Sequence, residues 1–285
     1  MKKISIIGTG NVGSLTVQYL LKEKLGHIFL INRHKKISEG LLLDTVSAFP
    51  DQYRQISLGT AKDIYQSDLI LITAGIVLRS DLDLEGLRIV KTLAKKYKFN
   101  PRSLVVFTTT PIDEAAELFQ MLTGHPKNRV MGFGGSLDLA RLKYLLAKKT
   151  GNNPKKIKGY YLGMHGTRGL ALFDLQIKNP QALRYATSNY YKEIVKRTGH
   201  STIYGPASQL ADLAKALLQN KKTPTEVSTW LNDYGMYATW PVKVSRSGVT
   251  DIIKVKLNPK EKIAIYQLLN FEKKRRKNLF KMALG

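Results

Sequence analysis

The segment Lys3-Ile-Ser-Ile-Ile-Gly8-Thr-Gly10-Asn-Val-Gly13 decides the fold class of this chain. A short apolar run ends at Gly8, and a pattern with helical spacing begins soon afterwards, over residues 12–24. A strand that passes into a helix through Gly-x-Gly-x-x-Gly is typical of a dinucleotide-binding fold. There Gly8 permits the tight turn, Gly10 lets the backbone approach a pyrophosphate, and Gly13 lets helix and strand pack closely. The pyrophosphate would be bound by the free amides and the positive end of the helix.

Further apolar runs alternate with helix-like segments through the first half of the chain. This alternation predicts a parallel sheet with crossover helices. The runs are rich in Ile, Leu and Val, which indicates strands that are buried on both faces. The strands are predicted at 3–8, 27–32, 69–73, 104–108 and 129–132, and the helices between them include 12–24 and 84–98.

After Ser136 the pattern changes. A predicted helix over 137–149 ends at Thr150-Gly-Asn-Asn-Pro154, a strong stop signal. Beyond it we predict strands at 157–162, 171–177, 238–244 and 250–255, and helices at 180–200, at 206–219 and near the C-terminus. We therefore expect an α/β fold: a doubly wound Rossmann domain over residues 1–135, followed by a mixed α+β substrate domain over residues 136–285.

Composition excludes several kinds of chemistry. The 285 residues include no cysteine, so disulfides, thiolate metal sites and cysteine nucleophiles are ruled out. No run approaches the roughly 20 apolar residues of a membrane span, and the N-terminus lacks the apolar run of a signal peptide. We expect a cytoplasmic protein with no membrane partner.

The formal net charge is +25, which leaves a polyanion partner open as an alternative. The lysines are spread along the chain, however, with one dense basic run at Lys273–Lys277 in the predicted C-terminal helix. No basic motif with interleaved aromatic residues is present, so we do not expect nucleic acid to be the partner.

The end of the second predicted strand bears on the cofactor. An acidic residue there would accept the ribose hydroxyls of NAD and repel a 2′-phosphate. This chain has Asn32 followed by Arg33. Asparagine removes the repulsion, and the arginine could pair with a phosphate, so both NAD and NADP remain open.

His165 is the candidate acid and base. Among the five histidines it alone lies in a glycine-flanked turn, Gly163-Met-His165-Gly166. Imidazole can exchange a proton near neutral pH, as carbonyl reduction by hydride requires. Asp138 and Arg141 share one face of a predicted helix, where the aspartate could orient a histidine and the arginine could hold a carboxylate by two parallel hydrogen bonds. Taken singly, these residues could equally be a turn histidine and a surface ion pair.

Five segments, in this order, together resemble the L-lactate/malate dehydrogenases. They are Gly8-Thr-Gly-Asn-Val-Gly13, Ile72-Thr-Ala-Gly75, Pro126-Lys-Asn-Arg-Val130, Leu137-Asp-Leu-Ala-Arg141 and Leu162-Gly-Met-His-Gly166. The resemblance implies an oxidoreductase that transfers a hydride between a nicotinamide cofactor and a small L-2-hydroxy acid or 2-oxo acid. It also implies a homo-oligomer, a dimer or tetramer, although no sequence feature fixes the number of subunits.

The resemblance further implies a role for individual residues. His165 would be the proton donor and acceptor with Asp138 as its partner, Arg141 would anchor the substrate carboxylate, and Arg79 would polarise the substrate carbonyl. The cofactor would be bound by Gly8, Gly10, Asn11, Val12, Gly13, Asn32, Arg33, Thr73, Ala74, Gly75 and Thr110.

The chain also departs from the family pattern. Only Ile76, Val77 and Leu78 separate Gly75 from Arg79, where the family has a longer loop that distinguishes lactate from malate. Thr109-Thr110-Pro111 replaces a Ser-Asn-Pro motif, and Met164 and Thr167 replace acidic residues beside the histidine. Some of these changes suit a bulkier, apolar 2-oxo acid. Others suit the alternative of a non-catalytic dinucleotide-binding protein.

Overall fold

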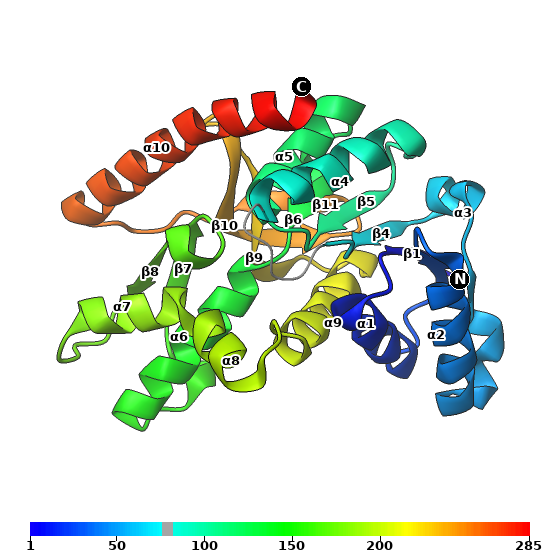
Figure 1. The fold of residues 1–285 in the computed structure, drawn as a ribbon. Coiled ribbons are helices and arrows are strands. Elements are labelled where there is room, and N and C mark those ends of the chain that lie inside the picture. The colour runs from blue at the N-terminus through cyan, green and yellow to red at the C-terminus, as the bar shows by residue number, and fades with distance from the viewer. Residues whose placement is uncertain (76–81) are drawn as a thin grey trace.

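The computed structural model describes residues 1–75 and 82–285 (Figure 1). Within these ranges eleven strands form one sheet, in the order β3-β2-β1-β4-β5-β6-β9-β10-β7-β8, and β11 pairs with β10. The first six of these strands are parallel. They are β1 (Lys3–Ile7), β2 (His27–Ile31), β3 (Ile56–Leu58), β4 (Leu69–Ile72), β5 (Leu104–Phe107) and β6 (Val130–Gly132). The order 3-2-1-4-5-6 is that of a doubly wound dinucleotide-binding sheet, which confirms the expected fold class.

The strands of the second half pair in antiparallel fashion. They are β7 (Gly159–Gly163), β8 (Gly169–Phe173), β9 (Thr223–Leu231), β10 (Met236–Ser245) and β11 (Gly248–Ile252). A single pairing, between Gly132 of β6 and Ser228 of β9, joins them to the parallel strands. The end of β6 therefore lies beside the antiparallel part of the sheet.

Helices cover both faces of the sheet (Figure 1). On one face α1 (Asn11–Lys22) packs against α9 (Tyr204–Leu218). On the other face α4 (Leu82–Lys96) packs against both α5 (Ile112–Thr123) and the long α10 (Pro259–Leu284). The remaining helices are α2 (Lys35–Ala48), α3 (Ala61–Gln66), α6 (Gly135–Thr150), α7 (Pro180–Ser188) and α8 (Tyr190–Thr198).

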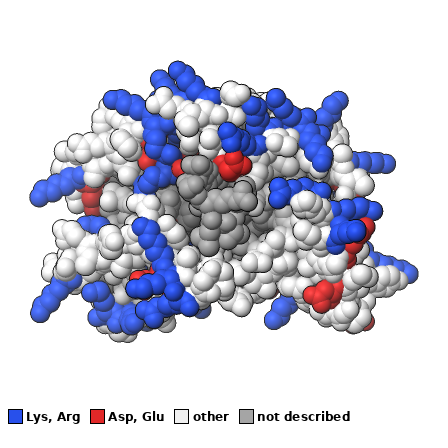
Figure 2. Space-filling model, in the orientation of Figure 1, with Lys and Arg blue, Asp and Glu red and all other residues white. Residues whose placement is uncertain are grey.

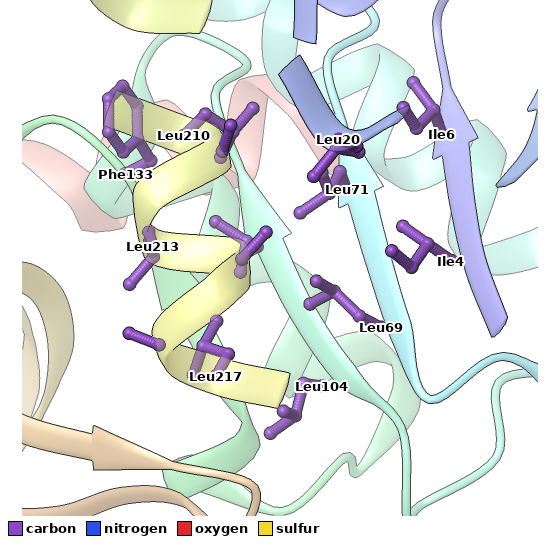
Figure 3. Close-up of a cluster of buried hydrophobic side chains, with 14 of the residues drawn as sticks. Ile4, Ile6, Leu20, Leu69, Leu71, Leu104, Phe133, Leu210, Leu213 and Leu217 are labelled. Carbon is purple, nitrogen blue, oxygen red and sulfur yellow. The ribbon is translucent and has the colours of Figure 1, made fainter. Parts of the chain in front are cut away.

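The core around the parallel strands consists of two clusters, because successive side chains of each strand point to opposite faces of the sheet. In β4, Leu69 and Leu71 belong to the cluster beneath α1 and α9, whereas Ile70 and Ile72 belong to the cluster beneath α4, α5 and α10. Figure 3 shows the first cluster, in which Leu210, Leu213 and Leu217 of α9 lie on the strands. Strands that are apolar on both faces are thus covered on both faces, as parallel strands require.

Several predicted boundaries were wrong. The segment 180–200 is two helices, because the chain turns at Asn189, which ends α7 and precedes α8. The strand predicted at 171–177 ends at Phe173, and Leu175 and Ile177 instead pack as irregular chain against a core cluster beside α6. The strand predicted at 250–255 ends at Ile252. Strands β3 and β9 lie where no strand was predicted.

The hairpin of β9 and β10 carries both tryptophans of the chain, Trp230 and Trp240. They line one cavity together with Tyr234, Ile252 and Tyr266. The Lys127 ammonium lies 3.4 Å from the centre of the Trp230 ring, a cation–π contact.

Lysine and arginine side chains are distributed over the visible face of the molecule, with few acidic ones between them (Figure 2). In the part of the chain that the structure describes, no helix is long and apolar enough to cross a membrane. The same residues contain no group of three His, Asp or Glu side chains that could hold a metal ion.

Candidate active site

The turn between β1 and α1 needs glycine at two positions. Gly8 has φ of +107°, and a Cβ there would lie 2.3 Å from the backbone nitrogen of Ala74. A Cβ on Gly13 would lie 2.1 Å from the carbonyl oxygen of Gly8, which also accepts a hydrogen bond from the Thr73 hydroxyl. The first turn of α1 therefore packs directly against the ends of β1 and β4, as the sequence predicted for this motif.

Gly10 differs from these two glycines. A Cβ built there meets no atom within 4 Å, so the backbone of Gly10 faces open space. Gly10 is also the N-cap of α1 and has no side chain to occupy the free amides of the first turn, which include those of Asn11 and Val12. An open backbone followed by uncapped amides fits an anionic phosphate group.

Asn32 follows β2 and supports the glycine turn. Its Nδ2 donates to the Thr9 hydroxyl at 2.8 Å, and its Oδ1 accepts from the backbone N–H of His34 at 3.0 Å. Both ends of the amide are thus engaged within the protein. The adjacent Arg33 is exposed, so its guanidinium can reach a bound anion.

The ends of β4 and β5 are tied together. The buried Thr109 hydroxyl donates to the carbonyl oxygen of Ala74 at 2.5 Å, whereas Thr110 is exposed. Gly75 follows Ala74 and is the last residue described before the gap at 76–81. Since β1, β4 and β5 are adjacent and parallel, the residues that follow them meet at one edge of the sheet, where doubly wound folds bind their ligands.

His165, Asp138 and Arg141 meet at the start of α6. Asp138 is fully buried; its Oδ2 lies 2.6 Å from His165 Nδ1, and its Oδ1 accepts from Arg141 Nη1 at 3.1 Å. The same Oδ2 accepts the backbone N–H of Gly166 at 2.9 Å. The carboxylate thereby leaves Nε2 as the ring nitrogen that is free to face a substrate.

Electrostatics favour a charged pair. Burial on its own lowers the pKa of His165, but the charge and hydrogen bond of Asp138 outweigh it and raise the pKa above its ordinary value. The His165 side chain keeps 23% of its surface exposed, so part of the ring is accessible from outside the protein. Burial alone would raise the pKa of Asp138, yet His165 and Arg141 hold that pKa below its usual range.

Two further contacts fix the backbone around His165. Gly134 has φ of +152°, and a Cβ there would lie 2.5 Å from His165 Nδ1, so only glycine allows this approach. The buried Asp113 accepts the backbone N–H of His165 at 2.9 Å and the Thr239 hydroxyl at 3.2 Å. Sequence reasoning missed both residues, although the pair of glycines at 134–135 was a visible signal.

Tyr190 contacts Arg141, and sequence reasoning missed this residue too. The guanidinium carbon of Arg141 lies 5.7 Å from the centre of the Tyr190 ring, at the start of α8. Arg141 is 8% exposed and is held between this ring and Asp138. Arg79, which the sequence predicted as a catalytic residue, lies outside the described residues.

One buried carboxylate therefore contacts a histidine and an arginine, an arrangement that suits proton exchange beside an anionic group. The chain also matches known proteins in both halves: residues 2–132 match the profile of the lactate/malate dehydrogenase NAD binding domain, and residues 135–282 match that of the lactate/malate dehydrogenase alpha/beta C-terminal domain. The chain belongs to the lactate/malate dehydrogenase family. It is accordingly a 2-hydroxy acid oxidoreductase, as the sequence predicted.

Curated relatives in the family carry both names. A malate dehydrogenase of Heliobacterium modesticaldum is 31% identical over 288 residues, which cover 92% of this chain and 93% of that protein. L-lactate dehydrogenase 2 of Lactobacillus johnsonii is 31% identical over 293 residues, which cover 91% of this chain and 92% of that protein. Family membership therefore leaves lactate and malate undistinguished.

Solved structures of the family superpose along the whole chain. The malate dehydrogenase from Aeropyrum pernix has a TM-score of 0.85 at 28% identity and covers 96% of this chain and 98% of its own. The lactate dehydrogenase from Cryptosporidium parvum, complexed with lactic acid and nicotinamide adenine dinucleotide, has a TM-score of 0.88 at 25% identity, with 98% of each chain covered. None of these likenesses favours the non-catalytic alternative.

Proposed function

We propose that this protein interconverts a small L-2-hydroxy acid and its 2-oxo acid, with His165 as the proton-exchanging group. The observation that carries the proposal is the bridging position of Asp138, whose two oxygens contact His165 at 2.6 Å and Arg141 at 3.1 Å. One buried carboxylate thereby couples a proton donor to a carboxylate-binding arginine, which matches a substrate with a carboxylate beside its reacting carbon.

In this proposal Arg141 binds the substrate carboxylate through its guanidinium. His165 donates its Nε2 proton to the carbonyl oxygen during reduction and accepts a proton from the hydroxyl during oxidation. Asp138 keeps the Nδ1 proton in place and stabilises the charged imidazole. When bound, the nicotinamide supplies or accepts the hydride.

We also propose which residues bind the nicotinamide cofactor. Gly8, Gly10 and Gly13, with the amides of Asn11 and Val12, would bind the pyrophosphate. Thr73, Ala74, Gly75 and Thr110 would line the nicotinamide side, and Asn32 and Arg33 the adenosine side. The open backbone at Gly10 supports this assignment.

The experiment that tests the function follows absorbance of reduced cofactor with pyruvate, oxaloacetate, 2-oxoisocaproate and phenylpyruvate. We expect turnover with one of them, and a His165→Asn variant that loses turnover by a factor of about 10² or more while its cofactor affinity is unchanged. Turnover that persists in His165→Asn would remove His165 from the mechanism. The panel also shows which substituent on the substrate is preferred.

We further propose that Asn32 and Arg33 allow this protein to use NADP as well as NAD. A carboxylate at position 32 would accept the ribose hydroxyls and repel a 2′-phosphate, whereas the exposed Arg33 attracts that phosphate. We expect Asn32→Asp to raise the ratio of kcat/KM for NADH to that for NADPH by roughly tenfold, about 1.4 kcal/mol. Arg33→Ala should weaken NADPH alone. An unchanged ratio in both variants would contradict the proposal.

A further inference from the structure

A cluster of charged side chains lies beside the turn that follows His165, and none of them has a role in the function proposed above. It consists of Glu114 of α5, Arg168 of the turn after His165, and Glu272 and Arg275 of α10. It is called the buried ion cluster because its two carboxylates are buried, whereas Arg168 and Arg275 keep 29% and 26% of their side chains exposed. Arg168 Nη1 lies 2.9 Å from Glu114 Oε1 and 2.5 Å from Glu272 Oε2. Glu114 is 0% exposed and Glu272 is 1% exposed.

Arg275 closes the buried ion cluster from the side of α10. Its Nε donates to Glu272 Oε2 at 2.8 Å, and its guanidinium also pairs with Glu114. The next residue, Arg276, pairs with Glu117 of α5 and donates from Nη2 to the sulfur of Met164 at 3.2 Å. Side chains of α10 therefore contact the residue directly before His165 as well as Arg168.

Helix α5 contacts both ends of the segment from His165 to Arg168. Asp113 accepts the backbone N–H of His165 at 2.9 Å, and the adjacent Glu114 pairs with Arg168. The segment from His165 to Arg168 is thus held at its first residue by one carboxylate and at its last by the next. A shift of the Arg168 end would change the direction in which the His165 ring projects from this short turn.

Stability alone explains the buried ion cluster poorly. Removing carboxylates from water is costly, and apolar residues of similar volume are often as stabilising as a buried ion network. The cluster also leaves Glu114 Oε2 without a hydrogen-bond partner in the described part of the chain. Such an arrangement provides directional contacts, and here those contacts converge on one turn.

We propose that Arg168 is a positioning residue, whose ion pairs with Glu114 and Glu272 hold the turn 163–168 so that His165 faces the substrate. This inference rests on the proposed role of His165. Arg168 does not exchange the proton or bind the acid. It couples Glu272 of α10, 104 residues later in the chain, to the geometry of the reacting site.

The test compares Arg168→Met with the parent enzyme in steady-state reduction of the best 2-oxo acid of the panel. A displacement of about 1 Å in a reacting group can lower a rate by a factor of about 10². We expect kcat to fall by a factor of roughly 10 to 100, while the KM for the acid and the Kd for reduced cofactor change by less than about threefold. Added guanidinium, below denaturing concentrations, should restore part of the lost kcat.

Two controls separate positioning from stability. Ile64→Ala creates a cavity in α3, which packs beside β1 and away from the turn, so it should lower Tm and leave kcat near the parent value. If Arg168→Met does not fold, Glu272→Gln takes its place: it removes the ion pairs of Glu272 with Arg168 and with Arg275, and should lower kcat to a smaller extent. An unchanged kcat in Arg168→Met or in Glu272→Gln would overturn the inference, whether or not Tm falls and whether or not KM rises.

The His165→Asn variant, measured in parallel, distinguishes failure of the proposed function from failure of the inference about Arg168. If it retains turnover, the proposed function fails and the inference fails with it. If it loses turnover while Arg168→Met keeps its kcat, only the inference about Arg168 is overturned.

Discussion

Asp138 is the residue on which the charge of the site depends most, because it contacts both His165 and Arg141. Its carboxylate raises the pKa of His165 above the ordinary value, and burial opposes this effect. In the proposed reaction, reduction requires the protonated imidazole, so we expect its rate to fall as pH rises through that pKa. Oxidation requires the neutral imidazole, so its rate rises over the same range.

We expect Asp138→Asn to move this transition to lower pH, because the charge that raises the pKa of His165 is removed. For reduction, kcat/KM should begin to fall at a lower pH than in the parent enzyme, and kcat at neutral pH should drop by a factor on the order of 10². Profiles of kcat/KM against pH measure this. Glu193→Gln, which removes an exposed carboxylate from α8, is the control and should leave the profile in place. A transition at the parent pH in Asp138→Asn would contradict the assignment.

The sequence was sufficient for the residues that share a local pattern and insufficient for those that meet only in three dimensions. Asp138 and Arg141 are close on one helix, and His165 stands out between glycines. Asp113 and Arg168 gave no such signal, because acidic residues near a helix N-terminus and an arginine after a turn are ordinary surface features. Asp113 is buried and Arg168 is partly buried because residues far away in the sequence surround them: Asp113 contacts His165 and Thr239, and Arg168 contacts Glu114 and Glu272.

Gly10, the N-cap of α1, and Gly13, in its first turn, differ in how closely other atoms approach them. A Cβ on Gly13 would lie 2.1 Å from the Gly8 carbonyl oxygen, whereas a Cβ on Gly10 meets no atom within 4 Å. Gly10 also has φ of −81°, which alanine adopts without strain. The two positions should therefore respond differently to the same substitution.

We expect Gly13→Ala to destabilise the fold by roughly 1–3 kcal/mol, since the helix must move away from β1. Gly10→Ala should leave Tm near the parent value and weaken cofactor binding about tenfold, because its methyl group occupies the space that the pyrophosphate needs. Thermal unfolding and titration of reduced cofactor measure the two effects. Equal losses of Tm in the two variants would contradict this division, as would unchanged cofactor affinity in Gly10→Ala.

Elements with long, uniform patterns were predictable, and short or mixed ones were not. The five strands predicted in the first half lie within about one residue of their observed positions, because each is a continuous apolar run. Strand β3 has three residues and β9 contains Pro224, Thr225 and Glu226, so neither shows a clear period. Strand β9 forms because β10 supplies a long antiparallel partner, which a local pattern cannot reveal.

The whole molecule carries a net charge of +25, and on the face that Figure 2 shows, Lys and Arg side chains far outnumber acidic ones. Like charges at this density repel one another, and the compact state is destabilised more than the expanded one. Salt screens the repulsion, with a Debye length of about 10 Å at 0.1 M. The surface charge should therefore make the stability of this protein depend on ionic strength.

We expect Tm to rise by a few degrees when NaCl increases from roughly 10 to 200 mM, the range over which the screening length shortens. A variant in which the exposed Lys98, Lys158 and Lys178 are all replaced by Gln should show a smaller rise. Scanning calorimetry or dye-based unfolding measures both proteins. A Tm that falls with added salt, or an identical rise in the two proteins, would show that repulsion is not the dominant effect.

The domain boundary and the oligomeric state expected from the sequence stay predictions. The domain boundary expected after residue 135 falls after the first residue of α6, and the sheet continues across it from β6 to β9. The homo-oligomer, dimer or tetramer, can be measured by light scattering. Neither the parallel order of the strands nor the two-sided core requires a second copy of the chain.

The position of the two tryptophans gives the protein an optical property. Trp230 and Trp240 lie on one hairpin, so the indole emission of the chain arises from a single region. That hairpin continues through β9 to β6, one of the strands at whose ends the cofactor would bind. Resonance energy transfer from these two indoles to a bound reduced nicotinamide would then depend on two donor–acceptor distances from one region of the fold. Occupancy could be followed by quenching of the native protein, without a label.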